Sequence, residues 1–396
     1  MIQEIKHNIF TVGANDPERK LFDALLPLKH GTTYNSYFIK GSEKTVLIDT
    51  VDPSKTEILL ANLKQLNVEK IDYIIANHAE QDHSGSLPFV LERYPNAKIL
   101  CSDKCVPMLV NYLQIPEEKF QIVVDGETLS LGDKTLQFIY TPWVHWPETM
   151  VTFAKEDKTL FSCDFFGTHF GLDDLLSSGE KETYDGAKSY FAEIMMPFCV
   201  MIREHMKKLE SYPIEMIAPS HGPIHSKPET ILANYRDWAS ETVKNEALIM
   251  YVSMHGSTKA MAEHLSKTLE TKGVKTYVYD ISTMELGEVA SHLIDSATVI
   301  IGTPCLLGGI HPSAAHLIFL METLKPKTKF ISILGSFGWS GGIMETITPM
   351  LKNFQVELIQ PVITKGLPKQ KDFEEIEKLA DAISRKHTEL FSSPAK

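Results

Sequence analysis

Hydrophobic residues in the first part of the chain fall into short runs separated by turn residues. The runs are rich in β-branched and aromatic side chains, a pattern typical of strands. They lie at residues 9–12, 33–39, 45–49, 71–76, 97–100, 121–124, 136–140, 150–153 and 159–162. Apolar positions at helical spacing occupy residues 57–66 and 229–238. Consecutive strands with helices between them predict a layered sandwich whose sheets are covered by helices.

The hydrophobic pattern changes after the polar run at residues 240–246. Ala247–Val252 is a continuous apolar run, like a strand that a parallel sheet buries on both faces. Further strands are predicted at 274–279, 298–302, 329–334 and 355–358, and helices at 259–271 and 373–390. The alternation predicts a flavodoxin-like, doubly wound parallel sheet of order 2-1-3-4-5 with a ligand crevice at its carboxyl edge. We therefore expect two domains, 1–245 and 246–396.

Length, charge and cysteine content narrow the class of protein. A chain of 396 residues is long for a single core, in agreement with two domains. The net charge of −12 argues against nucleic acid or an anionic membrane as the main partner. No apolar run has the length of a membrane span or the character of a signal peptide, so we expect a cytoplasmic protein. The five cysteines are scattered, which excludes a four-cysteine metal module.

The segment Asn77–Gly85 carries the densest set of potential metal ligands. His78, Glu80, Asp82 and His83 follow a predicted buried strand, where a rigid sheet can hold converging side chains. Two imidazoles and two carboxylates this close together would need strong compensation if they were buried without a cation. The segment therefore predicts a metal site, and the alternative is a solvated polar loop.

Three later ligand-type residues lie in the same position relative to predicted strands. His145, Asp164 and His221 each come just after a strand and are flanked by glycine, proline or both. Any one of them alone would more often be a hydrogen-bonded histidine or a turn aspartate. His225 competes with His221, and we favour His221 because it directly precedes a Gly-Pro turn. A set of imidazoles and carboxylates without a thiolate favours iron or manganese over a zinc-thiolate site.

Further expectations concern the surroundings of this site. His169 could line the pocket or face solvent as a loop histidine, and Tyr190 could present its hydroxyl to the site or be a core tyrosine. Trp143 and Trp146 are expected to pack around His145 and exclude water.

Three loops at successive strand ends of the second half predict a flavin site. The loop 253–258 opens a helix with hydroxyl groups and a glycine, and a helix N-terminus binds phosphate. It is neither a dinucleotide fingerprint nor a P-loop, so a monophosphate such as FMN is expected. Trp339 offers an aromatic face to a flat ring. The residues predicted to bind FMN are Ser253, Met254, His255, Gly256, Ser257, Thr258, Thr303, Pro304, Cys305, Leu306, Gly308, Ser336, Phe337, Gly338, Trp339, Ser340 and Gly341. The alternative is a flavodoxin-like regulatory domain with ordinary turns.

Taken together, these motifs resemble those of a known protein family. The order of ligands resembles the metallo-β-lactamase superfold, with Glu80 at the place of its second histidine. With the flavodoxin-like half and the segment Gly31–Asn35, the whole chain resembles the flavodiiron proteins (A-type flavoproteins). The resemblance implies an α/β fold, with a lactamase-like αββα sandwich before the flavodoxin-like domain. It also implies one iron at His78, Glu80 and His145, a second at Asp82, His83 and His221, and Asp164 as the bridge.

The resemblance further implies reduction of O2 to water or of NO to N2O at two non-haem irons, with electrons from the FMN of a partner protomer. A homodimer or homotetramer is therefore expected. Because the sequence carries no rubredoxin or reductase extension, we expect a separate donor: rubredoxin, a flavoprotein reductase or reduced F420. Phe165, Phe166 and Phe170 are expected to line an apolar path for the gas.

Two other functions remain open at this point. A dinuclear zinc hydrolase with a fused flavodoxin domain would use the same ligand frame, although Glu80 argues against it. An FMN electron carrier or redox sensor would use the first domain only as a scaffold, and iron-free protein with full function would support it.

Overall fold

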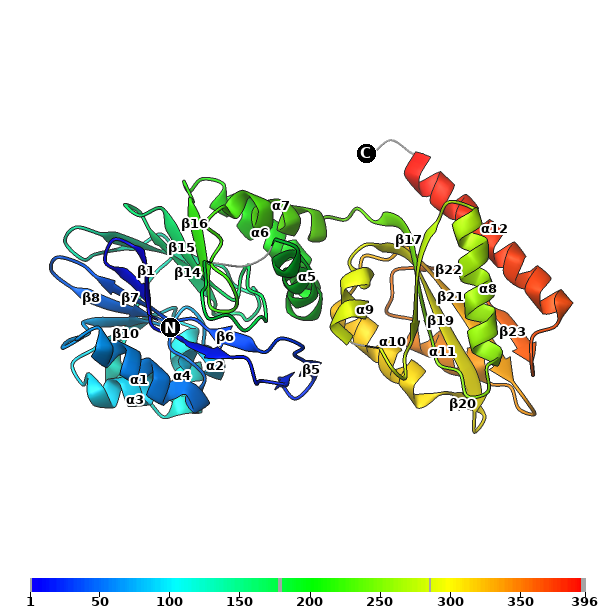
Figure 1. Cartoon of the computed structure of the whole chain (residues 1–396), viewed down its shortest axis with the longest axis horizontal. Coiled ribbons are helices and arrows are strands. Elements are labelled where there is room, and N and C mark those ends of the chain that lie inside the picture. The colour runs from blue at the N-terminus through cyan, green and yellow to red at the C-terminus, as the bar shows by residue number, and fades with distance from the viewer. Residues whose placement is uncertain (1, 177–179, 285, 393–396) are drawn as a thin grey trace. The chain divides into compact units, whose positions relative to one another are not determined.

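The computed structural model describes residues 2–176, 180–284 and 286–392. It divides into two compact units, Met1–Phe191 with Phe198–Ala239 and Ala192–Pro197 with Ser240–Lys396 (Figure 1). The boundary predicted between residues 245 and 246 falls inside strand β17 (Lys244–Tyr251).

Two sheets face each other in the first unit. The first sheet has the order β1-β2-β7-β8-β9-β10-β11 and the second has the order β12-β13-β14-β15-β16. The strands of the first sheet are β1 (Gln3–Lys6), β2 (Ile9–Thr11), β7 (Tyr37–Lys40), β8 (Thr45–Ile48), β9 (Tyr73–Ile75), β10 (Lys98–Cys101) and β11 (Phe120–Ile122). The strands of the second are β12 (Thr128–Ser130), β13 (Thr135–Tyr140), β14 (Met150–Ala154), β15 (Thr159–Cys163) and β16 (Met216–Pro219). Their inner faces bury one core that includes Ile48, Phe138 and Phe161.

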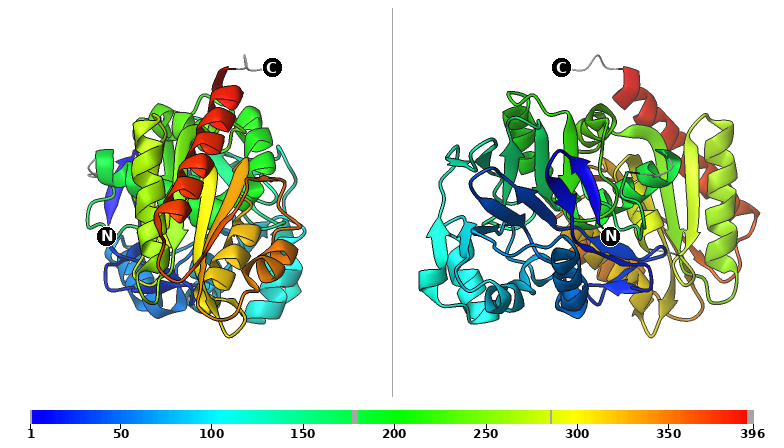
Figure 2. Two further views of the ribbon diagram at one scale, coloured as in Figure 1. Left: turned by 90° about the vertical axis from the view of Figure 1, so that its right-hand side faces the viewer. Right: turned by 60° about the vertical axis from the view of Figure 1, so that its left-hand side comes forward.

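Helices cover the outer faces of both sheets (Figures 1 and 2). Helices α1, α3 and α4 lie on the side of the first sheet, and α6 and α7 lie on the side of the second. The helices of this unit are α1 (Thr56–Gln65), α2 (Gln81–Ser84), α3 (Leu87–Arg93), α4 (Cys105–Leu113), α5 (Glu180–Tyr190), α6 (Cys199–Leu209) and α7 (Pro228–Trp238). Short helical turns occupy Pro53–Lys55, Glu117–Lys119, Phe191–Met195 and Met196–Phe198. The predicted αββα sandwich is confirmed.

The prediction of one continuous strand at residues 33–39 is wrong, because the chain forms two separate strands there. The chain leaves the sheet between β6 (Thr32–Tyr34), which pairs with β3 (Ala14–Asp16), and β7. The reason is Asn35, whose amide group donates to the carbonyls of Pro219 and Gly222, both at 2.9 Å. Beyond β3, a small hairpin of β4 (Leu21–Phe22) and β5 (Leu26–Pro27) projects from the sandwich.

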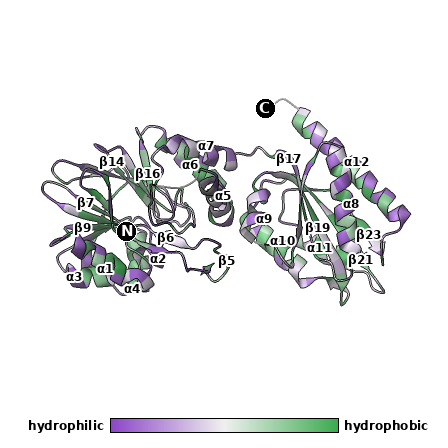
Figure 3. Ribbon diagram, in the orientation of Figure 1, coloured by the Kyte–Doolittle hydropathy of each residue, from purple (hydrophilic) through white to green (hydrophobic). Residues whose placement is uncertain are grey.

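The second unit has the predicted doubly wound sheet. Its central order is β18-β17-β19-β21-β22, so the order 2-1-3-4-5 is confirmed. The strands besides β17 are β18 (Lys275–Asp280), β19 (Ser296–Leu306), β20 (Gly309–Ile310), β21 (Phe330–Phe337), β22 (Glu357–Leu358) and β23 (Val362–Lys365). Strand β23, which pairs with the end of β21, was not predicted. In Figure 3 the central strands are mainly hydrophobic, in keeping with their burial on both faces.

Five helices flank this sheet among the described residues. They are α8 (Ser257–Thr271), α9 (Leu286–Leu293), α10 (Pro312–Leu324), α11 (Ile343–Met350) and α12 (Gln370–Ser392). Helices α8 and α12 pack side by side on one face, and α9, α10 and α11 lie on the other (Figures 1 and 2). Within the described parts of the chain, none of the helices combines the length and the apolar character that a membrane crossing requires.

Candidate metal centre and flavin loops

Buried hydrogen bonds fix the segment that carries the first ligands. Asp49, at the end of β8, accepts hydrogen bonds from the backbone N–H and the side-chain amide of Asn77, at 2.8 and 2.9 Å. The side-chain oxygen of Asn77 in turn accepts from the hydroxyl of Thr152 on β14, at 2.8 Å. Asn77 thereby ties the two sheets together directly before His78. The short helix α2 then points Asp82 and His83 to the same side of the sandwich.

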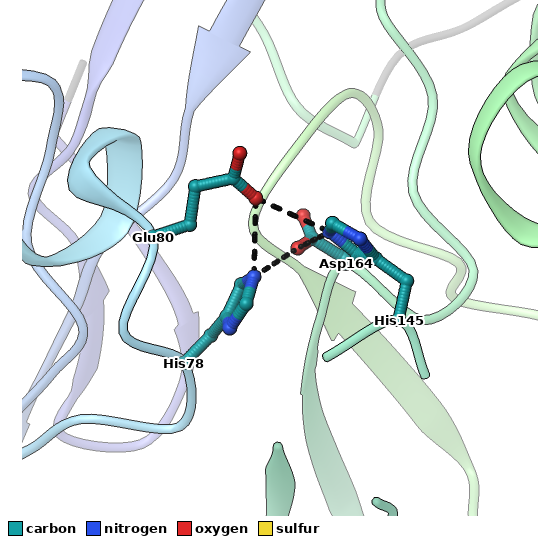
Figure 4. A group of neighbouring side chains, drawn as sticks. All are labelled: His78, Glu80, His145 and Asp164. Atoms are coloured by element: carbon teal, nitrogen blue, oxygen red, sulfur yellow. Dashed lines mark hydrogen bonds and ion pairs between the residues drawn. The ribbon is translucent and has the colours of Figure 1, made fainter. Parts of the chain in front are cut away.

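The first group of candidate ligands consists of His78, Glu80, His145 and Asp164 (Figure 4). Glu80 Oε2 lies 3.1 Å from His78 Nε2 and 3.2 Å from His145 Nε2. Asp164 Oδ2 lies 3.4 Å from His78 Nε2 and 3.2 Å from His145 Nε2. One ligand atom from each of four side chains therefore converges on a common point.

The second group contains Asp82, His83 and His221 and shares Asp164 with the first. His221 Nε2 lies 3.0 Å from Asp82 Oδ2, and His83 Nε2 lies 3.3 Å from Asp82 Oδ1. The other carboxylate oxygen of Asp164, Oδ1, lies 3.0 Å from His83 Nε2 and 3.4 Å from His221 Nε2. Asp164 thus directs one oxygen to each group.

The donor set fits a pair of metal ions better than a hydrogen-bonded network. Both carboxylate oxygens of Asp82, Nε2 of His83 and Oδ2 of Asp164 are buried and have no hydrogen bond of good geometry with any residue that the structure describes. Asp82 Oδ1 nevertheless lies 3.3 Å from His83 Nε2, Asp82 Oδ2 lies 3.0 Å from His221 Nε2, and Asp164 Oδ2 lies 3.2 Å from His145 Nε2, closer than unpaired buried polar atoms normally stay. Lone pairs that converge without donors between them are what two cations sharing one carboxylate would use.

Outer hydrogen bonds orient two of the histidines. His78 Nδ1 lies 2.6 Å from Glu148 Oε1, and His221 Nδ1 lies 2.6 Å from the carbonyl of Thr33. A ring that donates from Nδ1 leaves Nε2 free to bind a metal, as is usual for metal-bound histidines. Gly222 follows His221 with φ +74°, and a Cβ there would lie 2.5 Å from the carbonyl of Thr168. This glycine is therefore required for the chain to turn directly after the ligand.

We expect Glu148→Gln to weaken metal binding about tenfold and Glu148→Ala up to about 100-fold, because the orienting partner of His78 is weakened or lost. A competition titration with a coloured chelator measures this affinity. Glu43→Gln, at an exposed position on the same unit, is the matched control and should leave the affinity unchanged. Equal affinities for all variants would contradict an orienting role.

The charges of the site compensate one another in the metal-free chain. Burial by itself would lower the pKa of His78, but Glu148 and Glu80 raise it to about 10. Burial likewise opposes the charged form of His145 and His83, yet neighbouring carboxylates raise their pKa to about 10 and about 9. Burial would raise the pKa of Asp164, but His83 and His145 hold it well below its ordinary value. In protein from which the metal has been removed, protonated imidazoles would therefore balance the carboxylates in place of the cations.

Metal loading at neutral pH should release roughly two to three protons per chain, because His78, His83 and His145 bind protons at this pH and must lose them to coordinate. Metal affinity should accordingly rise as the pH increases towards the raised pKa values. A pH-stat titration of metal-free protein with Mn²⁺ counts the protons. His7→Gln, on an exposed side chain, should release the same number.

The structure places the other residues predicted near the site in different positions relative to the two ligand groups. Tyr190 donates its hydroxyl hydrogen to Asp164 Oδ1 at 3.0 Å, and burial keeps its pKa well above the ordinary value. His169 packs at 4.8 Å from the His221 ring, and its buried Nε2 has no hydrogen-bond partner in the described part of the chain. His225 lies outside both groups, with Nε2 3.0 Å from the carbonyl of Phe166. Cys163 lies near His83 and Asp164, but burial keeps the pKa of its thiol well above the ordinary value.

A pocket of about 280 Å³ opens beside the ligands. It is lined by Arg19, Phe22, Asp23, Asp52, Glu80, Gln81, Asp82, Tyr112 and Trp146. Phe165 and Phe166 are not part of this lining, because their rings stack on each other at 3.9 Å and pack against Tyr235 in the core. Phe170 stacks on His30 instead. The apolar gas path expected at these residues stays a prediction.

Two further details differ from the sequence-based expectations. Trp146 packs edge-on against His78 at 5.0 Å, as expected, but Trp143 is exposed. The residues of the hairpin β4–β5 and Glu148 were missed, because a short hairpin and a lone glutamate leave no distinctive sequence signal.

The loop after β17 has the features of a phosphate site. Gly256 has φ +84° and precedes α8, whose first turn has no side-chain cap. The hydroxyl of Ser253 is buried and has no partner within residues 2–176, 180–284 and 286–392. The hydroxyls of Thr258 and Ser336 lie 3.0 Å apart and join this loop to the end of β21. Free N–H groups at the start of a long helix and an unpaired hydroxyl fit the phosphate of FMN.

The other two predicted loops begin later than expected. Thr303–Leu306 continues β19, and Ser336 and Phe337 end β21, because both strands pair beyond their predicted ends. The loops then meet at Gly342, where φ is +108° and a Cβ would lie 2.2 Å from the carbonyl of Gly308. Trp339 is 85% exposed in this loop and leaves an aromatic face open for a flat ring.

Comparison with known proteins supports the assignment of both domains. Residues 32–222 match the ODP family beta lactamase model, and residues 249–379 match the flavodoxin model. The nitric oxide reductase of Moorella thermoacetica is 34% identical, with 90% of each chain covered. The coenzyme F420H(2) oxidase of Methanothermobacter marburgensis is 34% identical, covering 81% of this chain and 83% of that protein. The structure of rubredoxin oxygen:oxidoreductase from Desulfovibrio gigas aligns with a TM-score of 0.95 at 28% identity, covering 99% of this chain and 100% of that chain.

The fold and the site define a class of oxidoreductase in which a lactamase-like metal domain is joined to a flavodoxin domain. The chain belongs to the flavodiiron protein family. Its flavodoxin domain indicates FMN, and the His, Asp and Glu cluster fits the diiron site of the family. The predicted family, fold class and cofactors are thereby confirmed, whereas the residue-by-residue ligand assignment stays a prediction.

Proposed function

We propose that the chain reduces O2 to water or NO to N2O at a non-haem diiron centre that receives electrons through FMN. The position of Asp164 carries this proposal, because its two oxygens serve two separate ligand groups. A carboxylate shared in this way would hold two irons close enough for both to act on one small molecule. The relatives named above are a nitric oxide reductase, an F420H(2) oxidase and an oxygen oxidoreductase.

The geometry supports a definite assignment of ligands. His78, Glu80 and His145 would hold one iron, Asp82, His83 and His221 would hold the other, and Asp164 would bridge them. His83 would be less constrained than His78 and His221, because its buried Nδ1 has no orienting partner among the described residues. FMN would bind at the three loops of the second unit, with its phosphate at the start of α8.

Irons and FMN, when bound, would supply the electrons: four, with four protons, reduce one O2 to two waters, and two, with two protons, reduce two NO to N2O and water. The chain's own residues prepare the site. Tyr190 holds Asp164 Oδ1 by a hydrogen bond, and Trp146 shields the ring of His78. Burial keeps the pKa of His169 well below its ordinary value, so this ring stays neutral. We propose His169 and Tyr190 as the residues that orient the second ligand group.

The proposal includes the assembly and the electron donor. A homodimer or homotetramer would bring the FMN of one protomer to the irons of another. The donor would be rubredoxin, a flavoprotein reductase or reduced F420. Fast reduction of the irons in monomers at high dilution would contradict the proposed homodimer or homotetramer. Steady-state turnover measured with each reduced donor in turn identifies the electron donor.

Anaerobic reduction followed by stopped-flow mixing tests the function. Protein with measured iron and FMN content is mixed separately with O2 and with NO, and the consumption of each gas is recorded. Reoxidation within the mixing experiment, with water or N2O as the product, supports the proposal. Zinc in place of iron, together with hydrolysis of a thioester or lactam, would support the hydrolase alternative. Full electron transfer by iron-free protein would support the carrier alternative.

A further inference from the structure

We propose that Asp23 is the proton-entry residue of the metal-site pocket, passing protons from solvent through pocket water to the end formed by Glu80 and Asp82. The inference rests on the proposed function, in which each electron delivered to O2 or NO is accompanied by one proton. A site that consumes protons needs a route for them from solvent.

The hairpin β4–β5 places Asp23 at the pocket. Asp23 and Ala24 both have positive φ, +49° and +52°, and the N–H of Leu25 donates to the carbonyl of Phe22 at 3.0 Å. Aspartate tolerates this left-handed turn conformation better than most residues. The Phe22 ring packs 4.3 Å from the ring of His169 and holds the turn against the metal site. The side chain of Asp23 thus lines the pocket, while the residue as a whole is exposed.

The pocket can hold the water that such a route requires. Its volume of about 280 Å³ corresponds to on the order of ten water molecules. Four carboxylates and one guanidinium line it, so it will be hydrated when no other molecule fills it. Glu80 and Asp82 belong both to this lining and to the ligand groups. Water filling the pocket would therefore connect Asp23 with the ligand groups.

Asp23 differs from the other charged groups of the pocket because it is free to exchange protons. Asp52 accepts from the N–H and the hydroxyl of Ser54, and Arg19 donates to the carbonyl of Leu21. Glu80 and Asp82 face the histidines of the site. Among the residues that the structure describes, none forms a hydrogen bond or ion pair with the carboxylate of Asp23. This carboxylate is therefore the available proton carrier between the pocket and solvent.

Asp23→Asn tests the inference, because asparagine keeps the shape and the tolerance of positive φ but cannot carry a proton. In protein with full iron and FMN content we expect turnover with O2 or NO to fall about 10- to 100-fold, with an increased solvent deuterium isotope effect. Small weak acids added to the buffer should restore part of the rate. Asp23→Glu should retain most of it.

A readout independent of turnover is the infrared difference spectrum of a pH jump. The wild-type protein should show the band of a titrating carboxyl group that Asp23→Asn lacks. Asp173→Asn, at an exposed aspartate of the same unit outside the pocket, controls for the loss of one negative charge and should turn over normally. Equal rates and isotope effects for wild type and Asp23→Asn would overturn the inference. Wild-type protein that consumes neither gas would instead overturn the proposed function.

Discussion

Asp164→Ala should remove both irons and abolish gas reduction while leaving FMN bound. Both carboxylate oxygens are used, one by each ligand group, so neither group keeps its full set of ligands. The loss of turnover should exceed the 10- to 100-fold effect that is typical of residues that only orient a ligand. Iron content, bound FMN and turnover are measured on one preparation, by metal analysis, the flavin spectrum and stopped-flow mixing with O2 and NO.

Asp173→Ala is the matched control for this change, because Asp173 is an exposed aspartate of the same unit that accepts a hydrogen bond from Asn15. It should keep iron, FMN and turnover. The binding of one iron by Asp164→Ala, with the other site empty, would show that Asp164 serves one group only. Two irons with normal turnover would contradict its role in the site.

Glu80→His should shift the first group from iron towards zinc and lower gas reduction by more than about 100-fold. Glu80 Oε2 lies between His78 Nε2 and His145 Nε2, and an imidazole there would create a three-histidine group with one negative charge fewer. Such a set suits zinc, which cannot pass electrons. Iron and zinc contents after growth with both metals, followed by turnover measurements, test this expectation.

The same substitution at Glu92, which is exposed on α3, is the control and should change neither metal content nor turnover. Iron retained in Glu80→His with near-normal turnover would mean that the carboxylate at this position does not select the metal. Zinc-loaded protein that still reduces O2 or NO would be a stronger contradiction.

Much of the fold could be predicted because its signals are local. Runs such as Ala247–Val252 show from their composition alone that a parallel sheet buries them, and the order of these runs predicted the doubly wound sheet. Errors occurred where a contact distant in sequence overrides the local pattern. Asn35 ends a strand because it bonds to carbonyls at 219 and 222, and β23 forms because the end of β21 offers it an edge.

The candidate site likewise has a part that could be predicted from local sequence signals and a part that could not. His78, Glu80, Asp82 and His83 are neighbours in sequence, so their spacing alone indicates a ligand cluster. The sequence also shows that His145, Asp164 and His221 each follow a strand. It does not show how far apart they lie, because that distance depends on how the two sheets pack.

The sequence by itself determined the class of this protein: two domains, a metal site without thiolates and a flavin site at the strand ends. These features follow from residue types and short-range spacing, which folding does not alter. The tertiary structure alone decided that Asp164 turns one oxygen to each ligand group, that Glu148 orients His78, and that a hairpin far from the ligands in sequence brings Asp23 to their pocket. Each of these is a contact between segments whose separation in space only the packed sandwich sets.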